Sequence, residues 1–196
     1  MHRRPAYRRE IEVKPSLRSQ ALNALLRVTL GRPLTDDDDV IALRRHYEKL
    51  DARQFRVAPP LERSPTTTGG VPGEWVVAPE SRIERVILYL HGGSFAYRFP
   101  NAHASLAGRL CRPLRARALL PDYRLAPEHP FPAAVDDATA AYRGLLAEGV
   151  SASDIVIAGD SAGGGLSMAT ALRLRELGQP LPRALVVLSP WTDLSL

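Results

Sequence analysis

Apolar residues gather in five short runs from residue 75 onward. The last four runs are apolar without the period-two alternation of a strand that is exposed on one face. They therefore predict strands that are buried on both faces of a parallel sheet. The runs that we expect to form strands are 75–78, 85–90, 116–121, 155–159 and 184–189.

Helical spacing of apolar residues separates the later runs. In one such segment, Val135, Ala138, Tyr142 and Leu145 fall on a single helical face. Strands and helices that alternate in this way predict an α/β domain, with helices on both faces of a mostly parallel sheet. The helices that we expect within this domain are 101–112, 133–147 and 163–177.

Two further helices are predicted before the sheet, at 16–30 and 36–52. Thr35 is placed to cap the second helix, and the aspartates that follow it suit the positive end of the helix dipole. Residues 58–73 are rich in proline, threonine and glycine, so we expect them to form a connection. A domain boundary near residue 52 follows from this pattern.

Composition and charge narrow the class of protein. The 196 residues carry a formal net charge of +5, but the arginines are scattered and an acidic run at 36–39 interrupts them, so we expect no nucleic-acid partner. Cys111 is the single cysteine, which excludes an internal disulfide, and we expect no metal and no cofactor. We see no membrane span and no secretory signal, and a free thiol suits the cytoplasm, where we expect the protein to reside.

Residues 159–163 read Gly-Asp-Ser-Ala-Gly, between a predicted strand and a predicted helix. This G-x-S-x-G spacing is typical of a sharp turn that needs small residues on both sides and that projects the serine hydroxyl. The start of the following helix directs N–H groups and its positive dipole end to the same place. A P-loop is excluded because Leu166 stands where lysine is needed. A dinucleotide fingerprint is excluded because Ser161 or Met168 stands where a glycine or another small residue is needed.

A second motif, His91-Gly92-Gly93-Ser94, follows a predicted buried strand. Its glycines allow the backbone to turn N–H groups outward, where they can stabilise the negative charge that develops on an ester carbonyl oxygen under attack. The plainer interpretation is a Gly-Gly turn at the end of a strand. The serine turn downstream favours the oxyanion interpretation.

These two motifs, together with 122-DYRLAPEHPFPAA-134 and 189-SPWTDLS-195, resemble the hormone-sensitive-lipase-type carboxylesterases of the α/β-hydrolase fold. The resemblance runs from about residue 16 to the end of the sequence, and the DYRLAPEHPFPAA block is far more specific than a short pattern. It implies the α/β-hydrolase fold and a serine esterase that acts through an acyl-enzyme. The partner that it implies is a small-molecule ester with a short to medium acyl chain.

The resemblance also implies roles for the motif residues. Ser161 would be the nucleophile. The N–H groups of Gly92, Gly93 and Ala162 would form the oxyanion hole.

Further residues would support these groups. His91 would orient the oxyanion loop and would not be the base, and Asp160 would support the nucleophile beside it. Ser94 stands where the family usually has a third glycine, so we expect a tuned loop that is still functional. Asp122, with Tyr123 and Arg124, would form a supporting shell within a rigid, proline-stiffened turn.

A triad acid and base are missing downstream of Ser161. In this fold the chain order is serine, then aspartate or glutamate, then histidine. Only Glu176 and Asp193 are acidic after Ser161, and no histidine follows it in the sequence. Asp193 follows a strand, but the aspartate that matches it in the family is not the acid.

The upstream histidines do not fill this gap. His129 lies in the structural loop and in the wrong chain order. His46 lies on the cap helix, and His103 is expected on a helix surface. We therefore expect neither the triad acid nor the base among these residues.

We interpret the sequence as a truncated copy, with a helical cap over 1–52 and a partial α/β-hydrolase core over 53–196, and we expect little or no turnover from it. The run 184–189 is apolar on both faces, so a sheet that ends there would expose an edge that is open to self-association. Two alternatives stay open: a non-catalytic module that binds small ligands, and one half of a split esterase.

Overall fold

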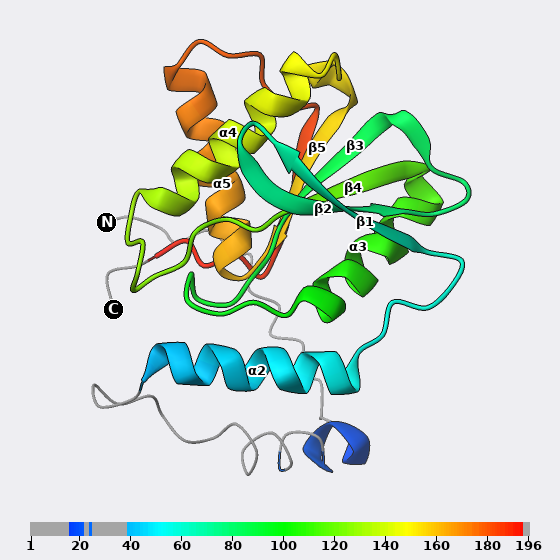
Figure 1. The fold of residues 1–196 in the computed structure, drawn as a ribbon, viewed down its shortest axis with the longest axis vertical. Coiled ribbons are helices and arrows are strands. Elements are labelled where there is room, and N and C mark those ends of the chain that lie inside the picture. Colours follow the sequence, from blue (N-terminus) through cyan, green and yellow to red (C-terminus); the bar gives the residue numbers. More distant parts are fainter. Residues whose placement is uncertain (1–15, 22–23, 25–38, 194–196) are drawn as a thin grey trace, which may run out of the picture. The chain divides into compact units, whose positions relative to one another are not determined.

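The computed structural model describes residues 16–21, 24 and 39–193, and the chain divides into two units between Asp38 and Asp39. In the first unit, residues 17–21 and 24 are helical, in agreement with part of the predicted helix at 16–30. The remainder of that helix lies outside the described residues. The second unit contains the sheet and its helices (Figure 1).

Six strands form one sheet in the order β1-β2-β4-β3-β5-β6. Strands β4, β3, β5 and β6 run parallel, while β2 pairs antiparallel with both β1 and β4. The predicted α/β-hydrolase sheet and all five predicted strands are confirmed. The strands are β1 Glu62–Thr68, β2 Val71–Val77, β3 Arg82–Leu90, β4 Ala116–Pro121, β5 Ile155–Asp160 and β6 Ala184–Leu188.

Helices cover both faces of this sheet, as the sequence predicts. Alternate residues of β3 are buried on opposite faces: Leu88 and Leu90 belong to one apolar core, and Ile87 and Tyr89 belong to the other. The first core also holds residues of α4 and α5, and the second holds residues of α3. This burial on both sides explains the continuous apolar run of β3. The helices are α3 Pro100–Leu114, α4 Ala133–Ala147, η1 Ala152–Asp154 and α5 Ala162–Glu176.

The expectation of a plain connection at 58–73 is wrong. Most of this segment belongs to a β-hairpin, in which β1 and β2 are joined through Gly69 and Gly70, with φ of 60° and 81°. Positive φ at both turn positions is what a tight hairpin requires, and glycine adopts it without strain. Because β1 is polar, exposed and at the sheet edge, its sequence carries no apolar signal.

Helix α2, Val40–Gln54, begins later than the predicted helix 36–52. Its cap is Asp39, whose carboxylate accepts hydrogen bonds from the N–H groups of Ile41 and Ala42. Thr35, the predicted cap, lies outside the described residues. The division of the chain at Asp38 separates α2 from the preceding residues, and the assignment of 1–52 as a cap stays a prediction.

A buried carboxylate attaches α2 to the core. Asp51 is 2% exposed and accepts hydrogen bonds from the N–H groups of Asn101 at 2.8 Å and Ala102 at 3.0 Å. These N–H groups belong to the first turn of α3, which has no side-chain cap of its own. One helix therefore supplies the N-terminal cap of another.

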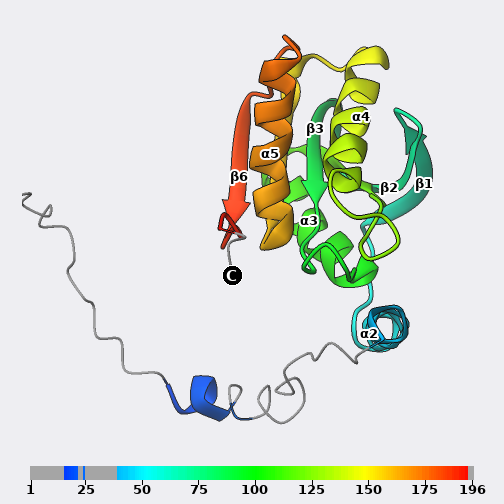
Figure 2. The same ribbon diagram turned by 90° about the vertical axis from the view of Figure 1, so that its left-hand side faces the viewer.

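The edge strand β6 lies beside α5 (Figure 2). Leu185, Val186 and Leu188 on this strand are exposed, as the apolar run at 184–189 predicts. Over residues 16–21, 24 and 39–193, no helix has the length and apolar character needed to cross a bilayer.

Replacement of Asp51 by alanine should destabilise the fold by about 1–3 kcal/mol, because it leaves two partly buried N–H groups of α3 without their acceptor. Urea unfolding of the purified chain measures this loss. The control is Asp39→Ala, which removes an exposed cap of α2 and should cost about 1 kcal/mol or less. Equal losses for the two variants would contradict a structural role of the Asp51 contact.

Candidate active site

The candidate site lies at the carboxyl ends of two neighbouring parallel strands, β3 and β5. The chain leaves β3 toward α3 on one face of the sheet and leaves β5 toward α5 on the other. The two connections therefore diverge from adjacent strand ends, which is the point where open α/β sheets form their binding crevices. The serine turn and the His-Gly-Gly-Ser motif meet at this place.

Ser161 occupies the sharp turn between β5 and α5. Its φ of 51° and ψ of −121° lie outside the regions that residues other than glycine favour, at a cost of about 1–3 kcal/mol. Backbone bonds hold this conformation: the Ser161 N–H donates to Leu188 O, and the Ser161 carbonyl accepts from Gly164, Gly165 and Trp191 N–H. The side chain is exposed, in the position of an accessible nucleophile.

The glycines around Ser161 are required by close packing. A Cβ atom at Gly163 would lie 2.0 Å from Leu90 O and 2.4 Å from His91 O, and one at Gly159 would lie 2.3 Å from Gly163 O. Contacts this short with backbone atoms are not possible. The serine turn therefore lies directly against the end of β3.

Loop 91–97, which follows β3, is also strained. Gly93, Ser94 and Phe95 have φ of 124°, 56° and 57° in succession. The N–H groups of Ala96 and Tyr97 both donate to Gly93 O. This geometry is uncommon for residues with side chains and needs support from its surroundings.

The N–H group of Gly92 is not a free oxyanion donor, which corrects the sequence prediction for this residue. It donates to Asp160 Oδ1 at 3.0 Å. By contrast, the N–H groups of Gly93, Ser94 and Ala162 have no acceptor within residues 39–193. Ala162 is the first residue of α5, where an N–H group has no partner inside the helix. The sequence did not predict the Ser94 N–H group as a donor, because the identity of a side chain does not reveal where the backbone N–H group of the same residue points.

Asp160 links the serine turn to loop 91–97. Besides Gly92 N–H, Asp160 Oδ1 accepts a hydrogen bond from the Tyr89 hydroxyl at 2.8 Å. Burial, together with the Asp160 carboxylate, raises the pKa of Tyr89 far above its ordinary value, so the tyrosine stays a donor. Asp160 therefore acts as a support beside Ser161, in line with its expected place.

His91 is buried behind the loop. Its Nδ1–H donates to its neighbour Gly92 O at 2.8 Å, and its ring stacks on Tyr123 at a centroid distance of 4.2 Å. Burial lowers the pKa of His91 to about 4, so the ring is neutral at pH 7. These contacts suit a residue that orients the loop, as the sequence analysis expects.

The expectation that His103 lies on a helix surface is wrong. It is 9% exposed in the first turn of α3, with Nε2 3.8 Å from Asp160 Oδ1. Burial lowers its pKa, against the opposing effect of nearby carboxylates. His46 and His129 are exposed. Within residues 39–193, no hydrogen bond joins a histidine to the Ser161 hydroxyl.

Side-chain contacts of residues 122–124 connect this segment to three other parts of the domain. Asp122 forms an ion pair with Arg98, and the Tyr123 hydroxyl donates to His91 O at 2.7 Å. Arg124 forms a two-pronged pair with the buried Asp137 of α4. The contacts favour the structural interpretation of this segment.

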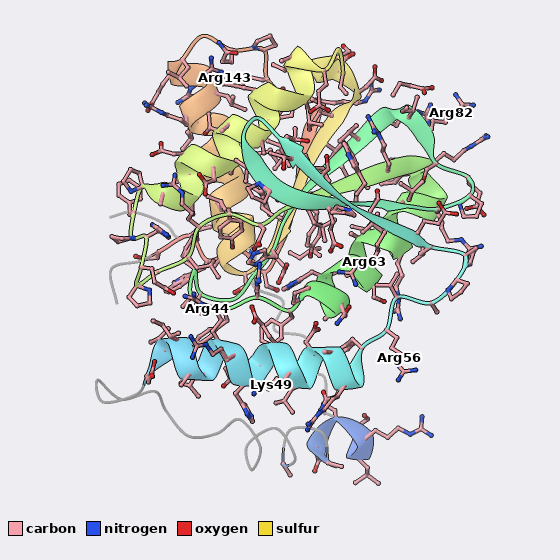
Figure 3. The ribbon with its side chains drawn as sticks, in the orientation of Figure 1. Arg44, Lys49, Arg56, Arg63, Arg82 and Arg143 are labelled. Atoms are coloured by element: carbon pink, nitrogen blue, oxygen red, sulfur yellow. The ribbon has the colours of Figure 1, made fainter. Side chains whose placement is uncertain are left out.

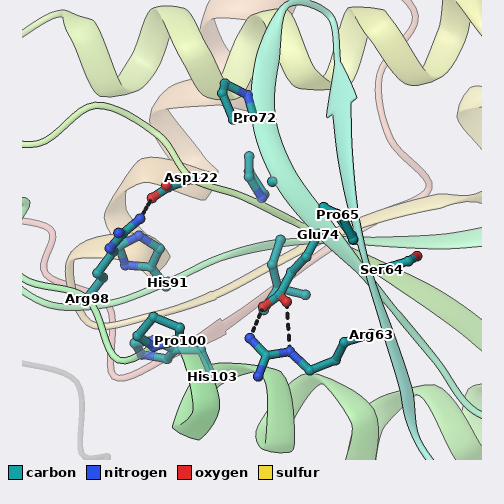
Figure 4. A pocket seen from close by; sticks show the side chains of 13 residues that line it. Arg63, Ser64, Pro65, Pro72, Glu74, His91, Arg98, Pro100, His103 and Asp122 are labelled. Carbon is teal, nitrogen blue, oxygen red and sulfur yellow. Dashed lines mark hydrogen bonds and ion pairs between the residues drawn. The ribbon is translucent and has the colours of Figure 1, made fainter. Parts of the chain in front are cut away.

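Two pockets flank the site. One, of about 400 Å³, lies beside His91, and its charged walls are two ion pairs, Arg63 with Glu74 and Arg98 with Asp122 (Figure 4). The other, of about 380 Å³, is mostly apolar and is lined by residues that adjoin the serine turn and loop 91–97, including Phe95, Gly165, Leu166 and Trp191. Ser161 is in the lining of neither pocket. Across the described part of the chain, no group of three or more His, Cys, Asp or Glu residues could hold a metal ion.

Comparison with known proteins agrees with this geometry. Residues 87–196 match a family described as alpha/beta hydrolase fold. An acetyl-hydrolase of Streptomyces hygroscopicus is 48% identical over 129 residues, which cover 66% of this chain and 43% of that protein. An esterase of Acinetobacter venetianus is 35% identical over 173 residues, which cover 88% of this chain and 56% of that protein.

Solved structures give the same result. An esterase from the bacterial hormone-sensitive lipase family superposes with a TM-score of 0.80 at 40% identity, over 89% of this chain and 57% of that one. The esterase EstE5, in a crystal soaked with p-nitrophenyl butyrate, superposes with a TM-score of 0.81 at 41% identity, over 89% of this chain and 58% of that one. The chain thus spans about half the length of these relatives. From its fold, its serine turn and these matches, the chain belongs to the α/β-hydrolase fold family, among the hormone-sensitive-lipase-type carboxylesterases.

Proposed function

We propose that the protein is a serine carboxylic-ester hydrolase, and that this chain carries its nucleophile and its oxyanion hole. The observation that carries the proposal is the strained, exposed Ser161 turn, directly followed by the N–H group of Ala162, which has no acceptor within residues 39–193. A serine held in this way can attack a carbonyl while backbone donors receive the developing negative charge.

The proposed reaction proceeds in two stages. Ser161 Oγ attacks the ester carbonyl carbon, a base takes the hydroxyl proton, and the carbonyl oxygen becomes an oxyanion. The N–H groups of Gly93, Ser94 and Ala162 stabilise this oxyanion, each by about 3 kcal/mol as in similar sites. Collapse of the intermediate releases the alcohol with the proton from the base, and water then releases the acid from the acyl-enzyme by the same path.

The proposal assigns the acid and the base to residues outside the printed sequence. No histidine follows Ser161, and His91 is neutral, buried and bonded to Gly92 O. Without a base, a serine hydroxyl is a weak nucleophile at neutral pH. The 196 residues on their own should therefore turn over little or no ester.

The apolar pocket near the serine turn supports an ester with an apolar group as substrate. Its volume of about 380 Å³ and its walls of Phe95, Leu166, Met168 and Trp191 suit a short to medium hydrocarbon chain. Arg124 is the one arginine in its lining, which contains no aspartate or glutamate, whereas the pocket beside His91 is lined by two arginine–carboxylate pairs.

Two properties of the protein in the cell and in solution follow as further proposals. We assign it to the cytoplasm because Cys111 is a buried free thiol, and cell fractionation would test this location. We also expect residues 1–196 on their own to self-associate through β6, whose exposed apolar residues lie at the edge of the described sheet. Sedimentation velocity of a Val186→Lys variant should then show a smaller species than the unchanged chain.

A chimera tests the esterase proposal. Residues 1–196 are joined to the part of the Streptomyces hygroscopicus acetyl-hydrolase that follows its matched segment, where the family resemblance places the acid and base. We expect serine-dependent hydrolysis of p-nitrophenyl butyrate, with a loss of about 10³-fold or more in kcat for Ser161→Ala.

The matched control is Ser153→Ala, which changes an exposed serine of η1 and should leave the rate unaltered. The printed chain alone should show no burst. A folded chimera without activity would favour the ligand-binding module over the esterase. Serine-dependent turnover by the printed chain would refute the assignment of the base to other residues.

A further inference from the structure

Arg44 of α2 uses its whole guanidinium group to contact two loops of the core. Its side chain is 15% exposed. Nε donates to Ala96 O at 2.7 Å, and Nη2 donates to Ala126 O at 2.6 Å. Both terminal nitrogens also bind Glu128, at 2.7 and 2.9 Å. Figure 3 shows Arg44 between α2 and these loops.

The two backbone segments whose carbonyl groups Arg44 contacts are also hydrogen-bonded to each other. Ala96 lies in loop 91–97, directly after the strained residues Ser94 and Phe95. Phe95 O accepts from Ala126 N–H at 2.8 Å, so Ala126 is bonded to loop 91–97 at its N–H and to Arg44 at its carbonyl. A rotation of the peptide that follows Ala96 would break the bond from Nε.

Loop 91–97 is thus fixed at both ends. Asp160 holds Gly92 N–H at the end near the serine turn, and Arg44 holds Ala96 O at the other end. The residues between these anchors carry the positive φ values and the N–H groups that have no acceptor in the described part of the second unit. A strained segment persists only when its surroundings determine its conformation.

We propose that Arg44 is a positioning residue, which holds loop 91–97 in the conformation that presents the N–H groups of Gly93 and Ser94. What these groups bind rests on the proposed esterase function, but the conformation itself does not. The contact makes the oxyanion donors depend on a helix that precedes the sheet in sequence. Lysine cannot replace Arg44 here, because one ammonium group does not span two carbonyl groups and a carboxylate in the fork geometry of a guanidinium.

The alternative role for Arg44 is to attach α2 to the core without any effect on loop 91–97. The other contacts of α2 make it possible to distinguish this role from positioning of the loop. Asp51 caps α3, and Glu48 pairs with Arg98 at 2.6 Å, so α2 keeps two attachments without Arg44. A positioning role therefore predicts a local change in loop 91–97, whereas an attachment role predicts general release of α2.

The test compares Arg44→Ala and Arg44→Lys with Arg45→Ala, in the ¹³C,¹⁵N-labelled chain. Arg45 is the matched control, since its side chain is exposed on the same helix and has no hydrogen bond or ion pair within residues 39–193. Nuclear magnetic resonance reads the Cα and Cβ shifts of Ser94 and Phe95, which report the sign of φ. It also reads the exchange rates of the Ala96 and Tyr97 amide protons that donate to Gly93 O.

We expect both Arg44 variants to move these shifts and to speed the exchange about tenfold or more, while Arg45→Ala does neither. Ethylguanidinium, but not ethylammonium, should restore the shifts in Arg44→Ala. Unchanged loop shifts in the Arg44 variants would refute the proposal. Shift changes that extend over the whole of α2, as in Asp51→Ala, would also refute it. Loop changes in Arg45→Ala as large as those in the Arg44 variants would refute it too. If Arg44→Ala does not fold, Arg44→Lys and Glu128→Gln decide, because Glu128→Gln keeps both carbonyl contacts and should leave the loop unchanged.

Kinetics of the chimera provide the functional measure. Arg44→Lys should lower kcat about tenfold or more with little change in KM, because the donors act on charge that develops in the transition state. A loss in KM alone would contradict the positioning role. A chimera without any serine-dependent hydrolysis would count against the proposed function, and the loop shifts of the printed chain would still decide the role of Arg44.

Discussion

The close approach of the start of α5 to the end of β3 determines the rest of the site. A side chain at position 163 would collide with the carbonyl groups of Leu90 and His91, and one at position 159 would collide with Gly163 O. Glycine at both positions lets Ser161 turn sharply beside the end of β3. The serine hydroxyl, the first N–H group of α5 and loop 91–97 are thereby brought to one edge of the sheet.

Asp160 determines which N–H groups remain available at that edge. Its carboxylate binds Gly92 N–H and the Tyr89 hydroxyl, and so joins the serine turn to the strand that carries the loop. The Gly92 N–H group is therefore not available to bind an oxyanion. The donors that remain lie one residue later in the loop than the sequence motif indicates, at Gly93 and Ser94, and Arg44 supports them from α2.

Local patterns explain what the sequence could predict. The run at 85–90 is apolar throughout because β3 is buried on both faces, and Gly159 to Gly163 specify their own turn. Contacts between segments that are far apart in the chain produce no local sequence pattern. Arg44 and Ala96 are 52 positions apart, and Gly92 and Asp160 are 68 positions apart. The burial of His103 and the polar strand β1 likewise depend on tertiary neighbours and not on local periodicity.

The most direct test of this account is a crystal structure of the esterase chimera after reaction with a p-nitrophenyl alkylphosphonate. The tetrahedral phosphorus adduct resembles the intermediate of ester hydrolysis, so one of its oxygens should occupy the oxyanion position. The account predicts that phosphorus is bonded to Ser161 Oγ. The N–H groups of Gly93, Ser94 and Ala162 should surround that oxygen, with Gly92 N–H still on Asp160. An oxygen bound by Gly92 N–H, or phosphorus on any other residue, would contradict it.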